Sequence, residues 1–361
     1  MQAEPSSPDG GAIAESFRRR VDDEVERELA ARRDQVATLA PEALALIDEI
    51  ARLFRAGGKR LRPLFCFWGH LGGGGVDGPE IVRAGAGVEV LHVSALMHDD
   101  VMDRAHLRRG APPSFRLLAG PGADRESFGQ AAAILAGDLA HALADELLTE
   151  CGFAPERVVR AFGHFHEMRV QAVSGQFLDL VSARERIGYD PSAGAARARR
   201  VAGLKSGSYS VTGPLLVGAT LAGAPPEVLN GLAAYGRPLG EAFQLRDDVL
   251  GTFGDPAVTG KDRDTDILEG KHTMLVAKSR ELGDDSARRV LDERLGRRDL
   301  PAEEIEEVRT IMRVSGALES TLELVRELAE LATAQLAQVP LAPAASAALA
   351  ELADQVAFRD E

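Results

Sequence analysis

Two short clusters of aspartates are the residues of this chain best suited to chemistry. In the first cluster, Asp99 and Asp103 are four residues apart and share one helical face, with Asp100 beside them. Their like charges repel, and the helix dipole also opposes negative charge at a C-terminal end. Such carboxylates suit Mg²⁺, which commonly bridges to substrate phosphates, so the cluster predicts a metal site. The alternative is a solvated acidic helix end.

The second cluster, Asp247 and Asp248, repeats this arrangement but has Gly251 where a third aspartate would stand. We expect Asp247 to be the main metal ligand and Asp248 to be secondary. Gln244 shares the face of Asp247, and Asp255 would contribute from the following loop through a water molecule. The alternative is an exposed helix end that Gly251 caps. Two such helix ends can face one another across a bundle, where metal sites are built from facing side chains.

Arginines and a basic turn accompany the aspartates. Arg108 and Arg109 follow the first cluster, and guanidinium groups bind phosphate oxygens through paired hydrogen bonds. The turn Gly57–Pro63 is compact, so Lys59 and Arg62 can project together toward an anion. Carboxylates for metal beside cations for phosphate predict a diphosphate site. Taken by itself, the basic turn is more typical of a surface loop.

Three lysines and one polar pair add to this set. Lys205, Lys261 and Lys271 supply further cations, although a single lysine more often faces solvent. Lys261 and Lys271 bracket an acidic loop that could close over a bound diphosphate. Gln176 and Asp179 share a helical face and predict support for metal-bound water, the alternative being a polar stripe on an amphipathic helix.

The elements that position these residues are predicted to be helices throughout. Strong helix formers dominate the composition, aromatic residues make up 5%, and strand-type clusters are scarce. Helical periodicity covers about 13–39, 42–55, 64–70, 80–103, 126–150, 156–183, 197–220, 226–250 and most of 273–361, with a loop over 254–270. We therefore expect an all-α protein with a disordered tail over residues 1–12 and a single domain over residues 13–361.

The overall charge and the cysteines limit the partners and the setting. A net charge of -14 argues against nucleic acid and requires local cations or metal ions around any anionic substrate. Cys66 and Cys151 form no disulfide framework or zinc motif, which favours a reducing cytoplasm. The N-terminus lacks a signal-peptide core, and no run of 18 apolar residues predicts a membrane span.

Taken in order, these motifs resemble the trans-polyprenyl diphosphate synthase family and its geranylgeranyl diphosphate synthase-like members. The resemblance implies the isoprenoid-synthase fold, a helical bundle around a central cavity. It also implies a homodimer that uses Mg²⁺, with three ions in each site. The matching motifs are 57–63, His92 with 99–103, 108–110, 176–180, Lys205, 243–244, 247–248 and 261–271.

The resemblance assigns roles to these residues in four groups. Those that look like metal ligands are Asp99, Asp103 and Asp247, supported by Gln176, Asp179 and Gln244. Those that look like the isopentenyl diphosphate site are Lys59, Arg62, His92 and Arg109. Those that look like contacts to the allylic diphosphate are Arg108, Lys205 and Lys261, with Lys271 as a closing residue. The residues expected to act in catalysis are Asp99, Asp100, Asp103, Lys205, Asp247 and Asp248.

The expected reaction joins isopentenyl diphosphate to an allylic diphosphate, head to tail. Metal ions and basic side chains stabilise the leaving diphosphate, which by resemblance also accepts the proton that is lost. Product length should depend on the helix wall before Asp99, formed by Ala95, Leu91 and Val88. Because Ser94 and Ala95 are small, we expect geranylgeranyl diphosphate. The alternatives are a farnesyl or longer-chain synthase, a terpene cyclase and a non-catalytic regulatory subunit.

Overall fold

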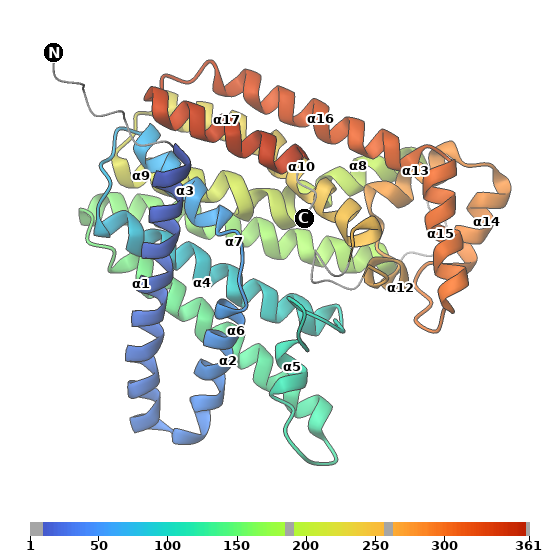
Figure 1. Ribbon diagram of the computed structural model, residues 1–361, viewed down its shortest axis with the longest axis horizontal. Coiled ribbons are helices and arrows are strands. Elements are labelled where there is room, and N and C mark those ends of the chain that lie inside the picture. Colours follow the sequence, from blue (N-terminus) through green and yellow to red (C-terminus); the bar gives the residue numbers. More distant parts are fainter. Residues whose placement is uncertain (1–9, 185–190, 256–262, 359–361) are drawn as a thin grey trace.

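The computed structural model describes residues 10–184, 191–255 and 263–358, and within these ranges the chain is all-α (Figure 1). The described residues form no strand, and a single antiparallel bridge joins Arg108 to Ala111. The predicted fold class is therefore confirmed.

The helices follow one another through short connections. The first part contains α1 (Gly10–Leu39), a 3₁₀ turn (Pro41–Ala43), α2 (Leu44–Arg55), α3 (Leu61–Gly72), α4 (Pro79–Met102), α5 (Ser114–Leu117), α6 (Arg125–Thr149) and α7 (Pro155–Arg184). The second part contains α8 (Pro191–Ala202), a π-helix (Gly203–Thr212), α9 (Gly213–Ala222), α10 (Pro226–Phe253), α12 (Thr265–Glu269), α13 (Met274–Leu282), α14 (Asp285–Arg294), α15 (Ala302–Val314), α16 (Ala317–Leu336) and α17 (Pro343–Phe358).

Most helices lie where the sequence predicts them, and the differences have local causes. Helix α1 begins at Gly10, so residues 10–12 are helical and do not belong to the predicted disordered tail. The helix predicted over 197–220 is divided into α8, a π-helix and α9. The predicted loop 254–270 contains the short helix α12. Helix α10 continues to Phe253, so Gly251 lies inside the helix and does not cap it.

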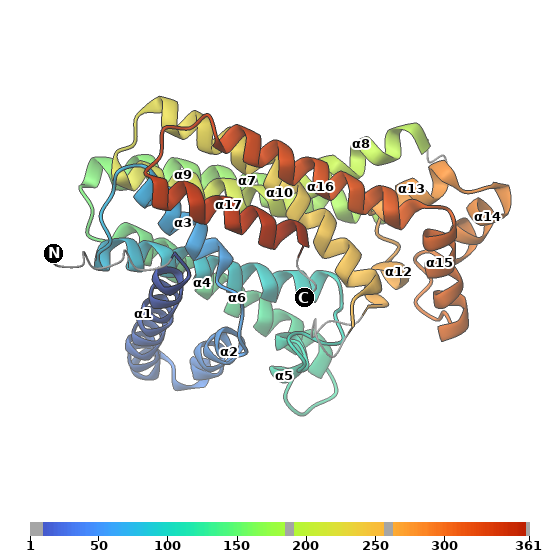
Figure 2. The same cartoon turned by 45° about the horizontal axis from the view of Figure 1, so that its top comes forward.

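One large hydrophobic core joins the first and last helices, from Phe17 in α1 to Ala357 in α17. Helix α4 packs between α3 and α6, while α10 packs against α16 and the π-helix. Helices α16 and α17 run side by side along the outer surface of α10 (Figure 2). Polar residues of α4, α7, the π-helix and α10 face a common space between these helices.

A second, smaller core lies at the end of the molecule that carries α14 and α15 (Figure 1). It begins with Val249 in α10 and Ile267 in α12 and continues through α13 to α15. This core fixes the short helix α12 against the C-terminal part of α10. The acidic residues of α12 are thereby held near the second aspartate cluster.

The π-helix Gly203–Thr212 is positioned by close backbone contact with α10. A Cβ atom on Gly240 would lie 2.6 Å from the Cα of Gly207, so both positions need glycine. This contact brings Lys205 and Tyr209 of the π-helix to the same space as Phe243 and its neighbours on α10. Short π-helical segments often occur at functional sites.

Candidate active site

Both aspartate clusters face one cavity of about 990 Å³ between α4, α7, the π-helix and α10. The structure brings together most of the side chains that the sequence singles out. Those that line the cavity are Lys59, Arg62, His92, Asp99, Asp103, Arg108, Arg109, Gln176, Asp179, Lys205, Gln244, Asp247, Asp248 and Lys271. Lys261 lies outside the described residues.

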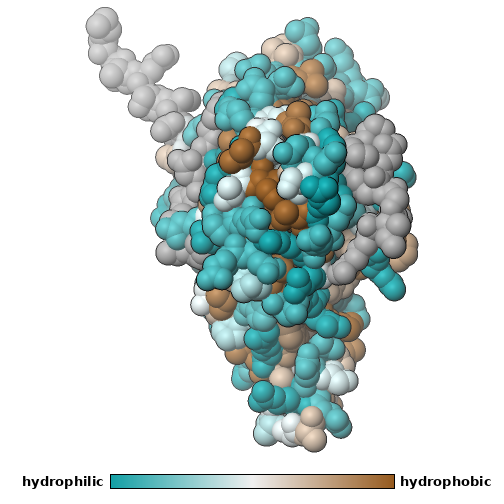
Figure 3. All heavy atoms as spheres, turned by 90° about the vertical axis from the view of Figure 1, so that its right-hand side faces the viewer, coloured by the Kyte–Doolittle hydropathy of each residue, from teal (hydrophilic) through white to brown (hydrophobic). Residues whose placement is uncertain are grey.

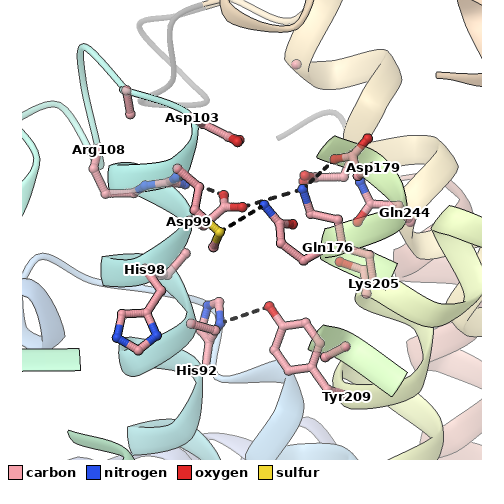
Figure 4. A pocket seen from close by; sticks show the side chains of 18 of the residues that line it. His92, His98, Asp99, Asp103, Arg108, Gln176, Asp179, Lys205, Tyr209 and Gln244 are labelled. Atoms are coloured by element: carbon pink, nitrogen blue, oxygen red, sulfur yellow. Dashed lines mark hydrogen bonds and ion pairs between the residues drawn. The ribbon is translucent and has the colours of Figure 1, made fainter. Parts of the chain in front are cut away.

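The first cluster is contacted by three cations from separate segments, of which Arg108 and Lys205 are labelled in Figure 4. Lys271 Nζ lies 2.6 Å from Asp103 Oδ2, and Lys205 Nζ lies 3.4 Å from Asp99 Oδ1. Arg108 Nη2 lies 3.6 Å from the other oxygen of Asp99. The carboxylates at the end of α4 are thus neutralised from across the cavity.

These contacts change the protonation behaviour of the carboxyl groups. Burial raises the pKa of Asp99, but Lys205, Lys271 and Arg108 outweigh it and hold that pKa below its usual range. The pKa of Asp103 is raised by burial and by the charge of Asp99, against the opposing effect of Lys271. Burial and Asp103 raise the pKa of Glu269 to about 8. Asp99 is therefore the carboxyl group whose ionised form is most favoured among these three.

Asp100 has a different role from the one predicted for it. Its side chain is fully buried and is absent from the cavity lining. It accepts a hydrogen bond of 2.8 Å from Arg108 Nε and lies 2.6 Å from Arg108 Nη2. Asp100 therefore positions Arg108 and does not line the cavity. Neighbouring residues on a helix point about 100° apart, which is why Asp99 and Asp100 separate.

In the second cluster, the position of Gly251 is flanked by a carboxylate from another helix. A Cβ atom on Gly251 would lie 3.2 Å from Asp266 Oδ2 of α12, and Asp266 lines the cavity. Asp255, which we expected to contribute here, is exposed and does not line the cavity. Asp266 therefore brings a carboxylate to the place where the sequence motif lacks one.

Asp248 is partly buried and lies among like charges. Gln244 Nε2 donates a hydrogen bond of 2.6 Å to Asp248 Oδ1. Burial, followed by the charge of Asp266, raises the pKa of Asp248 well above its ordinary value. A positive ion near Asp247 and Asp248 would reverse this effect.

Asp179 and Lys205 meet because α7 and the π-helix touch at a glycine. A Cβ atom on Gly175 would lie 2.2 Å from the backbone nitrogen of Lys205. One turn further along α7, Asp179 Oδ2 accepts a hydrogen bond of 2.8 Å from Lys205 Nζ. The amide of Gln176 lies beside Met102, 4.0 Å from its sulfur (Figure 4). Lys205 thus connects α7 to the aspartates of α4.

The basic turn before α3 supplies the other end of the site. Arg62 donates hydrogen bonds to Tyr209 Oη at 3.0 Å and to Ser210 Oγ at 2.7 Å. The His92 ring lies 3.4 Å from the same Tyr209 hydroxyl (Figure 4). Burial, with Arg62 adding to it, lowers the pKa of His92 well below its ordinary value, so the ring is neutral at pH 7.

Arg109 points toward the same turn from the loop after α4. Its Nη1 donates a hydrogen bond of 2.7 Å to the carbonyl oxygen of Leu53. Burial lowers the pKa of Arg109 to about 10, and the nearby arginines Arg60 and Arg108 add to this effect. An anion placed here would relieve the repulsion between these guanidinium groups.

The residues around the first cluster suit a bound divalent cation. Within residues 10–184, 191–255 and 263–358, no three His, Cys, Asp or Glu side chains converge closely enough to hold a metal without rearrangement. Instead, the ammonium groups of Lys205 and Lys271 stand among Asp99, Asp103 and Asp179. Positive charge is thus already accommodated between these carboxylates, as oxygen-liganded Mg²⁺ would require.

Comparison with known proteins identifies the family. The polyprenyl synthetase family profile matches residues 45–312. The chain is 36% identical over 268 residues to a geranylgeranyl diphosphate synthase of Sulfolobus acidocaldarius, covering 72% of this chain and 74% of that protein. It is also 36% identical over 228 residues to a geranylfarnesyl diphosphate synthase of Aeropyrum pernix, covering 62% of this chain and 67% of that protein.

A solved structure gives the same result. The fold superimposes on geranylgeranyl pyrophosphate synthase from Corynebacterium glutamicum, complexed with isoprenyl diphosphate and magnesium, with a TM-score of 0.86 and 31% identity. The match covers 95% of this chain and 98% of that structure. This chain belongs to the polyprenyl synthetase family. It is a prenyltransferase, and the predicted reaction class, chain elongation on a prenyl diphosphate, is confirmed.

Membership of the polyprenyl synthetase family agrees with a divalent metal in the site, since the Corynebacterium structure contains magnesium. The product names of the two relatives differ, so the comparisons leave product length open within the family. No described helix of this synthetase is long and apolar enough to cross a membrane.

Three features of this polyprenyl synthetase site were not predicted from the sequence. Asp266 lies in the acidic loop that the sequence suggested only as a closing segment. Tyr209 follows Lys205 by four residues on the same helical segment, a spacing that could have revealed it. Arg60 is buried, with its Nη1 3.0 Å from Glu89 Oε1 and its Nε 2.7 Å from Asp22 Oδ1. These two ion pairs hold the basic turn in place.

Proposed function

We propose that this chain joins isopentenyl diphosphate to an allylic diphosphate, head to tail, to give a linear all-trans product of geranylgeranyl length or longer. One observation carries the proposal. Facing carboxylates, phosphate-binding cations and an apolar helix wall meet around a single cavity of about 990 Å³. Carboxylates with cations suit the diphosphates, and the apolar wall suits the growing hydrocarbon chain.

Three Mg²⁺ ions are assigned to the loaded site. Asp99 and Asp103 would hold ions from α4 and Asp247 would hold one from α10, with Gln176 and Asp179 supporting metal-bound water. Bound Mg²⁺ supplies charge that stabilises the diphosphate leaving group. Carboxylates from both sides line the cavity, and Asp266 adds one on the side of α10.

The allylic diphosphate is assigned to cations near the first cluster. Arg108, fixed by Asp100, and Lys205 would bind its oxygens, and Lys271 would close the site. Lys261 belongs to the same group by its position in the motif. Lys205 and Lys271 would exchange a carboxylate partner for a diphosphate oxygen, which keeps both ammonium groups paired as substrate enters.

Isopentenyl diphosphate is assigned to the opposite, basic end. Lys59 at the cavity rim, Arg62 and Arg109 would bind its diphosphate, and neutral His92 would donate or accept a hydrogen bond beside them. Its double bond would attack the allylic cation, and the departed diphosphate would take the proton that is lost. Closed apolar surroundings keep water from quenching the cation.

The wall of α4 favours a product longer than farnesyl. Ala95 and Leu91 line the cavity, and Ala95 leaves the first turn below Asp99 open. Val88, which we predicted to continue this wall, is buried and does not line the cavity. We expect Ala95→Phe to shorten the product, because the ring would fill the open turn. Mass spectrometry of the dephosphorylated alcohols measures this. An unchanged product distribution would contradict the prediction that this part of α4 controls product length.

A homodimer is part of the proposal. Exposed apolar side chains gather on α7 at Val170, Val173 and Phe177 and on α6 at Phe128 and Leu135. The end that carries α14 and α15 is instead mostly hydrophilic, with one compact apolar patch (Figure 3). The same surface on a second copy would bury the α6 and α7 side chains around a two-fold axis. Sedimentation analysis tests this, and a monomer at micromolar concentration would contradict it.

We further propose that residues 13–361 form a single domain, to which α1 adds residues 10–12. The main core, which includes residues from α1 to α17, supports this assignment. The proposed location is the cytoplasm, because Cys66 and Cys151 are free thiols buried in that core.

The test is a product assay with purified protein. Isopentenyl diphosphate is supplied with dimethylallyl, geranyl or farnesyl diphosphate, with Mg²⁺ or with EDTA, and products are sized by mass spectrometry. We expect linear alcohols that depend on Mg²⁺ and reach geranylgeranyl length or beyond. Cyclic hydrocarbons from one allylic substrate would indicate a terpene cyclase. No turnover with any starter would indicate a regulatory subunit.

A further inference from the structure

The lower end of the cavity lies well below the aspartates, on α4, α6 and α7. Leu91 lines the cavity eight residues before Asp99, which corresponds to about 12 Å along the helix. The next residue on that face, Val88, is 1% exposed and lies behind the lining. The hydrocarbon chain of a growing product therefore reaches its limit near Leu91 on this side.

Helices α4 and α6 close the cavity just below this level. A Cβ atom on Gly87 of α4 would lie 3.0 Å from the carbonyl oxygen of Ala144 and 3.3 Å from the Cβ of Leu147. The two backbones are therefore too close for a prenyl chain to pass between them. Further growth would have to proceed between α6 and α7.

Two polar side chains stand at this opening. His141 of α6 and Arg169 of α7 both line the cavity. Arg169 forms an ion pair with Asp145, one turn after His141 on α6, and its guanidinium lies 4.2 Å from the centre of the Phe165 ring. The Arg169 side chain is 11% exposed, and its Nε is buried with no hydrogen-bond partner among the described residues.

A charged group is an unusual floor for a cavity that would hold hydrocarbon. Burying the apolar surface of each further prenyl unit favours growth. Covering or displacing a paired guanidinium opposes growth, because the charge loses water or its partner. For one prenyl unit the two effects are of similar size, so the chain gains little by growing past Arg169.

We propose that Arg169, held in place by Asp145, is the floor that sets the maximum product length. The inference rests on the proposed synthase activity and adds a specificity-determining residue to it. It differs from the wall of α4, because it places the limit on the ion pair that joins α6 to α7. Burial and the charge of Arg169 also lower the pKa of His141, which keeps that neighbouring ring neutral.

The experiment compares product lengths from isopentenyl diphosphate and farnesyl diphosphate in four variants and the unmodified protein. The double variant Arg169→Leu with Asp145→Asn removes both charges, and Arg169→Gln removes only the positive one. Arg169→Lys keeps the charge. Arg160→Leu is the matched control, because Arg160 is an exposed arginine of α7 that does not line the cavity.

We expect products at least one prenyl unit longer from the double variant and from Arg169→Gln. The ratio of elongation to release at the former limit should rise by at least about tenfold, equivalent to 1.4 kcal/mol. Arg169→Lys and Arg160→Leu should keep the original length. A purely structural role would change the melting temperature and total turnover but not the length.

The possible failures are distinguishable. If the unmodified protein makes no product, the proposed function is wrong. If the unmodified protein is active and both charge-removing variants make products of unchanged or shorter length, the proposal that Arg169 limits product length is wrong. Because Arg169→Gln can still donate a hydrogen bond to Asp145, it tests the floor even if the double variant does not fold.

Discussion

The first aspartate cluster lies among cations, whereas Asp248 in the second is surrounded by other carboxylates. Asp99 is contacted by Lys205 and Arg108, and these charges lower its pKa. Asp248 has Asp266 as its strongest charged neighbour, and its pKa is raised. Two motifs that look alike in sequence are thus in opposite electrostatic environments.

This difference indicates how the two clusters depend on metal. The protein itself balances the charge of the first cluster, so its carboxylates are stabilised before any ion binds. Around Asp248 the carboxylates repel one another until a cation arrives. We therefore expect the first cluster to determine the rate and the second to determine the concentration of Mg²⁺ that is required.

The largest effect is expected from Asp99→Asn. This change removes the carboxylate that Lys205, Lys271 and Arg108 all act on, and kcat/KM should fall by about 10²–10³-fold. Steady-state kinetics at saturating Mg²⁺ measures it. Asp124→Asn, at an exposed aspartate before α6, is the control and should have no effect. A loss below about tenfold would show that the first cluster is not the centre of the site.

A smaller effect is expected where Asp266 stands beside Gly251. Asp266→Asn should raise the Mg²⁺ concentration for half-maximal rate by about tenfold, as when a supporting ligand is lost. Gly251→Asp alone should also impair activity, because the new carboxylate would crowd Asp266 Oδ2.

The combined variant decides between two explanations of Gly251. If Asp266 occupies the place of the missing aspartate, Gly251→Asp together with Asp266→Asn should restore the Mg²⁺ requirement toward normal. Titration of the rate with Mg²⁺ is again the measurement. A double variant that is worse than either single change would mean that Asp266 acts independently of the second cluster.

The smallest effect is expected on stability without metal. The raised pKa of Asp248 means that its contribution to stability is complete below its ordinary pKa and is lost as pH rises from there through its raised pKa in the folded state. In EDTA at pH 7, Asp248→Asn should therefore raise the free energy of unfolding by about 1 kcal/mol. The effect should disappear near pH 3.

Asp99 should behave in the opposite way in the same experiment. Its lowered pKa contributes stability above the ordinary carboxyl pKa, and this is lost as pH falls. Asp99→Asn should therefore lower the free energy of unfolding at pH 7, measured by urea denaturation in EDTA. If both substitutions changed the free energy of unfolding in the same direction, the two clusters would not differ in their electrostatic environments.

The sequence predicted the fold and most of the site because both depend on local spacing. Helical periodicity placed α4 and α10, and the four-residue interval placed Asp99 and Asp103 on one face. The basic turn Gly57–Pro63 was found from its glycines and cations. The structure brings these motifs to one cavity, as the hypothesis of facing helix ends required.

Other features could not be predicted because they depend on packing between distant helices. Asp100 could not be separated from Asp99 in role until the position of Arg108 was known. The approach of Asp266 to Gly251 depends on how the smaller core holds α12 against α10. The cavity ends below Leu91, where Gly87 lets α4 pack closely against α6. The periodicity of α4 alone does not predict this contact between helices.

The π-helix Gly203–Thr212 makes the site depend on the width of a single helical segment. Its hydrogen bonds are wider than those of an α-helix, so residues five apart lie on nearly the same face. On an α-helix, Lys205 and Ser210 would point about 140° apart. If this segment became α-helical, Lys205 would leave Asp179 while Ser210 still met Arg62. The widened turns thus allow one short segment to serve both ends of the site.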